Sequence, residues 1–320
     1  MLTRRNFLAA SASTLIAARL RAQTSAIDVT AVERARILAA APAALVAKPT
    51  TLADLSTTMA TLAAAFLLVR DDKYAARALS LLNILTAIKP SEDILTLIPI
   101  AEIAVAIRFL VDSATTAQLS DFDAWILGIK LFLNADPEMT LARDRKDHRA
   151  SAWLLIASAI ARYQRDEHAL DDCRRRFRKP TLRNQINLQG QFPEELATAN
   201  PYRNTLFNFD LLCCICQLLA SPFDLLWDYE LPDGVGLRIA VATIYPSIAD
   251  RNKWPGVADA EHFHELPGRR PGLLFAGRAY KRPEYVELWR SLPPEIPPAL
   301  TASFPIREPL LWTTRALHGF

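Results

Sequence analysis

The feature that most constrains the fold is a series of apolar segments in which hydrophobic residues recur at three- and four-residue spacing. Such spacing gathers the apolar side chains on one face of an α-helix. Alternating β-branched runs are nearly absent, and the 320 residues include only 9 glycines. The sequence therefore predicts an all-α protein with helices over residues 57–70, 74–88, 97–110, 122–133, 151–163, 206–220 and 237–249.

Short polar breaks separate these segments, among them RDDK at 70–73 and LPDG at 231–234. Antiparallel helix pairs packed side by side would bury the apolar faces. Because no fixed repeat is visible, we expect an α/α toroid, an incomplete helical barrel of antiparallel helix pairs, and not an open array of identical units. The alternative, a transmembrane bundle, is disfavoured because nearly every segment contains charged residues and no later run is long and uncharged enough.

The first residues, MLTRRNFLAASASTLIAARLRAQ, have the order of an export signal. Arg4 and Arg5 precede an apolar run that is too short to span a bilayer, and small residues follow near Ala22. We interpret residues 1–23 as a twin-arginine signal and residues 24–320 as one domain. The mature protein is then expected to be periplasmic or secreted, with no membrane association. The alternative is an ordinary amphipathic first helix.

The segment after residue 250 is rich in proline, which interrupts helices. Two short helices are expected near residues 271–280 and 283–292, followed by an irregular tail packed against the toroid. No domain boundary is evident within the mature chain.

Charge and cysteine content exclude several classes of partner and cofactor. The formal net charge is +3, and the basic residues form short bursts such as 174–179, so no nucleic-acid partner is expected. In a helix Cys213 and Cys216 share a face while Cys214 points elsewhere, and no CxxC pair completes a four-ligand metal cage, so the three are expected to pack in the core. His262 and His264 form an HxH pair, which suits zinc on a strand but lacks a third ligand; a surface loop is the alternative. We expect no metal and no cofactor.

Several stretches occur in an order that is typical of one enzyme family. DRKDHRASAW at 144–153 places His148 where an apolar helix begins, and RNQINLQGQFPEELATANPYRNTLFNFDLL follows at 183–212. LLWDYELPDGVGLRIAVATIYPSIADRNKWP and RRPGLLFAGRAYKRPEYVELWRSLP complete the series. In these stretches, about two thirds of its length, the chain resembles the alginate lyase family of polysaccharide lyases. The resemblance implies an α/α toroid that acts on uronic-acid polymers in the periplasm.

The resemblance also implies a reaction. In β-elimination a base removes the proton beside a uronate carboxylate, donors neutralise that carboxylate, and an acid protonates the leaving oxygen. The family's Asn-Asn-His is Lys146, Asp147 and His148 here, so only the histidine is retained. Asp147 would repel a uronate. Thr198 stands at the place of the family's arginine and Asn204 at that of its tyrosine.

Neighbouring residues offer substitutes for the missing groups. Tyr202 and Arg203 lie within two residues of the lost tyrosine and are candidates for the acid and for a carboxylate clamp. Lys146 and Asn204 are candidates for substrate binding. In the alternative interpretation Tyr202 packs beside Pro201, Arg203 lies on the surface and His148 is structural. Between residues 39 and 91 aromatic residues that could stack on sugars are scarce.

Three functions remain open at this point. The first is an exported polysaccharide lyase-like protein that cleaves an acidic, alginate-like polyuronate. The second is a catalytically degenerate carbohydrate-binding or scaffold protein with the same toroid. The third is a helical interaction protein without a sugar partner. The sequence leaves the oligomeric state open.

Overall fold

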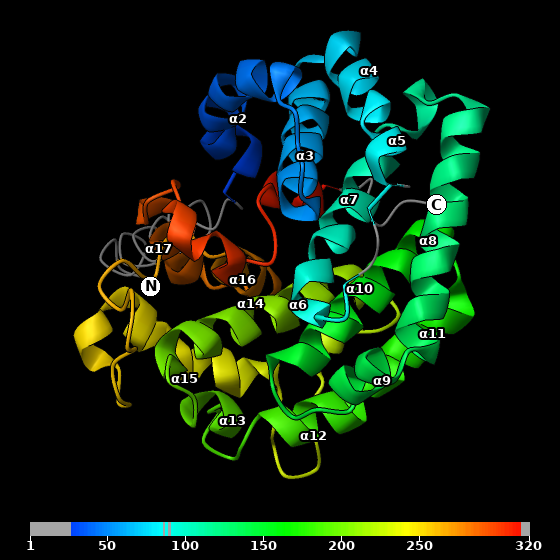
Figure 1. Ribbon diagram of the computed structural model, residues 1–320. Helices are drawn as coiled ribbons and strands as arrows, with labels where there is room; N and C mark the ends of the chain where they lie inside the picture. The colour runs from blue at the N-terminus through cyan, green and yellow to red at the C-terminus, as the bar shows by residue number, and fades with distance from the viewer. Residues whose placement is uncertain (1–26, 86, 89–90, 315–320) are drawn as a thin grey trace, which may run out of the picture.

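Helices form nearly all of the regular structure in the computed structural model, which describes residues 27–85, 87–88 and 91–314. Within these ranges β-pairing is limited to two isolated bridges. The predicted export signal, residues 1–23, lies outside the described residues. Five helices follow one another round a ring, each packed against the next (Figure 1): α3 (Leu52–Val69), α7 (Pro99–Arg108), α10 (His148–Gln164), α14 (Pro201–Leu219) and α16 (Pro271–Ala279).

A second layer of helices covers the outside of this ring. Helices α2 and α4 pack on α3, α11 packs on α10, α15 on α14 and α17 on α16, while α8 covers α9 and α10. The prediction of an all-α, incomplete toroid is confirmed. The outer helices are α2 (Val29–Val46), α4 (Asp72–Ser80), α8 (Thr116–Ala135), α9 (Pro137–Arg143), α11 (Glu167–Arg176), α15 (Leu237–Ala249) and α17 (Pro283–Ser291).

Local sequence explains where most of these helices begin. In the first half of the chain an Asp or Thr side chain accepts a hydrogen bond from an amide of the first turn, which would otherwise lack a partner. In the second half a proline occupies the first helical position, where its missing N–H costs nothing. The predicted helix over 97–110 is divided before Pro99 into α6 (Ile94–Leu97) and α7. Helices α2, α9 and α11 were not predicted.

The C-terminal tail enters the middle of the ring (Figure 1) and is fixed there by buried carboxylates. Helix α18 (Pro309–Thr313) packs against α2, α3 and α7. Just before it, the buried Glu308 accepts hydrogen bonds from Arg36 of α2 and, at 3.0 Å, from the Thr61 hydroxyl of α3. Glu102 of α7 accepts from the amides of Arg307 and Glu308 at 2.7 and 2.8 Å. On the other side of the tail, Trp312 stacks on Phe275 of α16 with ring centroids 6.4 Å apart, so the tail bridges the gap between α3 and α16.

Helix α14 is buried along most of its length. Its three cysteines are free and buried, which confirms that they pack in the core. Asp210 pairs with Arg270 at 2.7 Å, and neither side chain is exposed. Asp210 also accepts from the Gly272 amide at 3.0 Å, and a Cβ at Gly272 would lie 2.5 Å from Phe209 Cε1. A glycine at the start of α16 thus lets the two helices approach closely.

By length and composition, α3 could cross a membrane, although no such segment was predicted from the sequence. In the structure 61% of its 18 residues are buried. It packs against α2, α4 and α7, so its apolar surface is covered by other helices of the same chain. The apolar composition of α3 is therefore explained by its burial in the core of the protein.

Candidate active site

His148 is the first residue of α10. It lies on the face of the ring where the N-termini of α10 and α14 are found. Asp147 caps the helix by accepting from the Arg149 amide at 3.0 Å. The imidazole packs edge-on against Phe207 of α14, with ring centroids 5.7 Å apart. Farther along the same helices, Ser151 bonds Asn208, so α10 and α14 run in parallel and share this end.

A buried carboxylate holds the imidazole. Glu195 of α13 (Pro193–Leu196) accepts from the His148 amide at 2.7 Å and lies 2.8 Å from His148 Nδ1. Because an ionised carboxylate can only accept, the proton of the neutral imidazole is assigned to Nδ1, and Nε2 keeps its lone pair. Nε2 has no hydrogen-bond partner among the described residues, and the largely buried His148 side chain keeps 8% of its surface exposed. This arrangement suits a general base.

A network of buried amides and hydroxyls supports Glu195. Asn208 donates to Glu195 and to Gln185, both at 2.9 Å. Ser151 lies 2.8 Å from Gln185, and Gln185 donates in turn to the carbonyl of Asp147 at 3.2 Å. Every member is buried and bonded, which fixes the orientation of the His148–Glu195 pair.

Three basic residues flank His148 in sequence at the start of α10. Arg145 and Arg149 both pair with Asp147, at 2.6 and 3.5 Å, and Lys146 is exposed. Burial acts to raise the pKa of Asp147, but the bonds from Arg145 and the Arg149 amide outweigh it and lower the pKa below its usual value. Asp147 is therefore ionised, and the guanidinium groups of Arg145 and Arg149 offset its negative charge. These two groups reduce the repulsion of a uronate that was expected from Asp147.

Helix α14 presents its candidate residues in different directions. A residue turns the helix by about 100°, so Asn204 lies on the same face as Phe207 and Asn208, three and four residues later. Phe207 contacts His148 and Asn208 bonds Glu195, which puts Asn204 on the His148 side. The side chain of Asn204 donates to the Thr198 hydroxyl at 3.1 Å. Of the candidate residues on α14, Asn204 is the one on the helix face that contacts His148 and Glu195.

Tyr202 lies on the opposite side of α14, two residues and about 200° away from Asn204. Its side chain is fully buried, its hydroxyl donates to the carbonyl of Ser247 at 2.8 Å, and its ring packs against Trp254 and Phe263. Burial also raises its pKa. The structure therefore corrects the prediction that Tyr202 supplies the acid: its hydroxyl is committed to the core and faces away from His148.

Arg203 is partly exposed, and its backbone amide, like that of Tyr202, donates to Asp259. Its position on α14 lies between the directions of Tyr202 and Asn204, about 100° from each. The predicted role of Arg203 as a carboxylate clamp, and that of Lys146 as a binding residue, stay predictions.

Two cavities adjoin this end of the ring. One of about 410 Å³ is lined by Arg145 and Arg149 and by the acidic Glu92, Asp93 and Glu138. The other, of about 760 Å³, lies where α3 and α7 begin, with the tail residues 298–307 as its second wall. Asp93 lines both, so the cavities adjoin each other. Among the described residues neither is lined by a tyrosine or tryptophan.

The histidines outside α10 do not gather ligands for a metal. Within the described ranges, no three His, Cys, Asp or Glu residues are arranged to hold a metal ion. His262, at a positive φ of 60°, pairs with Glu265 at 2.7 Å, while His264 packs against Phe263. The HxH pair therefore lies in a loop.

Glu195, Asn208 and Gln185 were not predicted from the sequence as site residues. Glu195 lies in FPEELA, one of the stretches that carry the family resemblance, directly after the exposed Glu194. A glutamate next to another glutamate gives no sign of which one is buried. Only the contact with a histidine 47 positions earlier distinguishes them.

Comparisons with known proteins agree with this architecture. A crystal structure of an alginate lyase from Bacteroides ovatus superposes with a TM-score of 0.68, covering 82% of this chain and 74% of that chain at 19% sequence identity. Comparison with curated protein sequences gives no match. The profile of the family described as alginate lyase matches residues 19–254, which is most of the chain. The chain belongs to the alginate lyase family.

Proposed function

We propose that this protein cleaves a uronic-acid polysaccharide by β-elimination at the His148–Glu195 pair. Membership of the family supports a polysaccharide lyase-like function. The observation that carries the proposal is the pair itself, in which a buried carboxylate holds one imidazole nitrogen and the other has no partner among the described residues. Arg145 and Arg149, which flank His148 in the chain and pair with the adjacent Asp147, supply positive charge of the kind that an acidic polymer requires.

In the proposed reaction, His148 Nε2 removes the proton from the ring carbon beside the uronate carboxylate. The electrons of the C–H bond form a carbon–carbon double bond, and the neighbouring glycosidic C–O bond breaks. The imidazolium then returns the proton to the leaving oxygen. Arg145, Lys146 and Arg149 offset the negative charge that grows on the carboxylate. Glu195 is a positioning residue that holds the ring and stabilises the imidazolium.

A second candidate is a carbohydrate-binding or scaffold protein that has lost the reaction. The burial of the Tyr202 hydroxyl favours it, because the leaving oxygen then depends on His148 alone for its proton. Such a protein would keep the cations and the cavities but would release no product.

Incubation of the mature protein with alginate, glucuronan and related polyuronates tests the proposal. Cleavage should raise the ultraviolet absorbance of unsaturated uronyl ends, and His148→Ala should abolish the increase. His168→Ala is the matched control, since His168 is exposed on α11. Thermal melts of both variants would show whether they fold. Absence of product from the folded wild-type protein with every polyuronate, together with binding of at least one, would favour the second candidate.

We also propose that residues 1–23 direct export through the twin-arginine route. Fusing these residues to a reporter that is active only after export should give a signal, and replacing Arg4 and Arg5 by lysine should abolish it. A signal that survives this replacement would contradict the twin-arginine assignment.

A further inference from the structure

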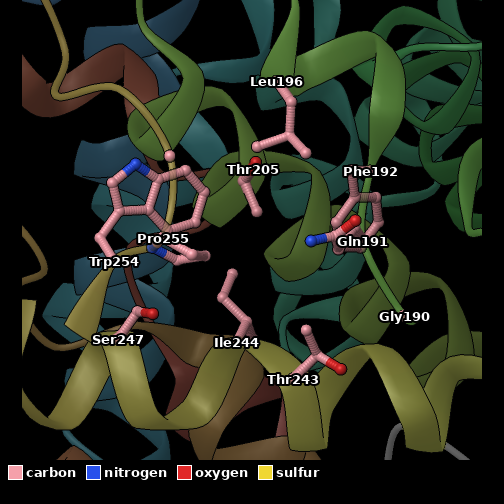
Figure 2. A pocket seen from close by; sticks show the side chains of 11 residues that line it. Gly190, Gln191, Phe192, Leu196, Thr205, Thr243, Ile244, Ser247, Trp254 and Pro255 are labelled. Atoms are coloured by element: carbon pink, nitrogen blue, oxygen red, sulfur yellow. The ribbon is translucent and has the colours of Figure 1, made fainter.

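A cavity of about 120 Å³ lies between α13 and α15, outside the candidate active site. Figure 2 shows Leu196, Ile244 and Trp254 around it, so its walls are mainly apolar. The hydroxyl groups of Thr243 and Ser247 already donate to backbone carbonyls, at 2.8 and 3.3 Å. These two hydroxyls are therefore not available to a ligand, and we assign no function to the cavity.

The outer face of α8 is a second feature that the proposed reaction does not use. Five residues with small or apolar side chains follow one another along this face at helical spacing, and all five are exposed: Ala124, Leu127, Gly128, Leu131 and Ala135. Leu127 is 50% exposed and Leu131 is 61% exposed. Figure 1 shows α8 at the edge of the molecule. We call these five residues the α8 stripe.

The inner face of α8 is apolar as well. Phe122, Ile126, Ile129 and Leu133 are buried there against the rest of the protein. A helix at a protein surface normally carries polar and charged residues on its outward side, whereas a helix that is apolar on all sides is normally buried on all sides. The composition of α8 therefore indicates that a partner covers the stripe.

Gly128 supports this interpretation. A glycine inside a helix costs about 0.5–1 kcal/mol relative to alanine, so its presence calls for a reason. At Gly272 the reason is visible, because a Cβ there would lie 2.5 Å from Phe209 of the neighbouring helix. A Cβ at Gly128 would meet nothing within 4 Å. Gly128 thus leaves room for a closely packed helix that this chain does not itself supply.

The charges beside the stripe argue against two other kinds of partner. Asp121 and Asp123 are exposed, and Lys130 is already paired with Asp166 at 2.9 Å. Helices that bind membrane surfaces carry cations beside their apolar face, and an acidic polysaccharide also requires cations. The side chains of the stripe offer no hydrogen-bond donor to a sugar either. Another apolar protein surface is the partner that suits the stripe.

We propose that the α8 stripe binds the α8 stripe of a second copy of this chain, with the two helices antiparallel about a point between Leu127 and Gly128. A twofold axis at this point is the commonest symmetry of a homodimer, and it opposes the two helix dipoles. Residues equally far from the point then come to the same level. Leu127 lies level with Gly128 of the partner subunit, and Leu131 with Ala124 of the partner subunit. Each leucine meets a residue with little or no side chain, so the stripe is complementary to itself.

The size of the stripe sets the strength of this dimer. Helix α8 has 20 residues and is therefore roughly 30 Å long. A contact about 10 Å wide along it would bury on the order of 300 Å² on each copy, against about 800 Å² per partner in a standard interface. We therefore expect a weak, reversible dimer with a dissociation constant in the micromolar to millimolar range.

Sedimentation velocity over micromolar to millimolar concentrations tests the proposal. The wild-type protein should shift from monomer to dimer as its concentration rises. Leu131→Asp should raise the dissociation constant about tenfold or more, because the dimer would bury an unpaired charge. Leu188→Asp is the matched control, since Leu188 is similarly exposed, at 58%, on a loop outside α8. A wild-type protein that stays monomeric at millimolar concentration, or a folded Leu131→Asp protein that associates as the wild type does, would overturn the proposal.

Mixing two charged variants tests the antiparallel register. Ala124→Glu and Leu131→Lys should each weaken self-association, because each would bury a charge without a partner. In a mixed dimer the new carboxylate and the new ammonium group lie at the same level, so the mixture should associate about tenfold more tightly than either variant alone. A mixture that associates no better than the separate variants would contradict the antiparallel pairing. These measurements do not involve catalysis, so they hold whether or not the proposed function is correct.

Discussion

Replacing Glu195 by glutamine tests whether this carboxylate sets the protonation of His148. Glu195 accepts three hydrogen bonds, two on Oε1 from the His148 amide and Asn208, and one on Oε2 from His148 Nδ1. In Glu195→Gln the remaining oxygen can keep the first two. The new NH₂ group then faces Nδ1, which must accept, so the imidazole proton moves to Nε2.

Two magnitudes follow from this geometry. Exchanging a charge-assisted hydrogen bond for a neutral one should lower the free energy of unfolding by about 1 kcal/mol. Converting Nε2 from an acceptor into a donor removes the base, which should lower the rate of polyuronate cleavage by about 10²–10⁴-fold. The activity loss would therefore greatly exceed any effect of partial unfolding.

The assay combines product absorbance, urea denaturation and ¹⁵N NMR of the His148 ring. The NMR spectrum should report a proton on Nδ1 in the wild-type protein and on Nε2 in Glu195→Gln. Glu194→Gln is the matched control, because Glu194 is the exposed neighbour on the same short helix. An unchanged tautomer, or full activity in a folded Glu195→Gln protein, would refute the role given to Glu195.

Three further predictions concern the core, the tail and the cations. Asp210→Asn leaves the buried Arg270 without a counter-charge, and urea denaturation should show a loss of about 3–5 kcal/mol. Burial raises the pKa of Glu102 to about 7, so the folded state retains a proton that the unfolded chain loses above pH 4.5. The stability of the wild-type protein should therefore fall as pH rises from 4.5 to 7. Thermal melts of Glu102→Gln over the same pH range should not show this fall. Lys146→Ala should weaken polyuronate binding by about threefold in titrations at low salt, and the difference should shrink as salt is added.

The sequence by itself determined the five ring helices and the class of fold. Hydrophobic spacing is a local property of the chain, so segments such as 206–220 and 237–249 could be assigned without knowing their neighbours. The Asp and Thr caps are local for the same reason. The order of stretches such as FPEELA and the histidine that begins α10 identified the family as well.

The tertiary structure decided which candidate residues can act together. Proximity in sequence suggested Tyr202 as a substitute acid, but two residues along α14 turn a side chain to the opposite face, where Ser247 takes its hydroxyl. The partner of His148 is Glu195, 47 residues away, and this pairing exists only because α13 is packed beside the start of α10. Contacts between distant segments depend on how the helices pack, and hydrophobic spacing along a single helix does not encode that packing.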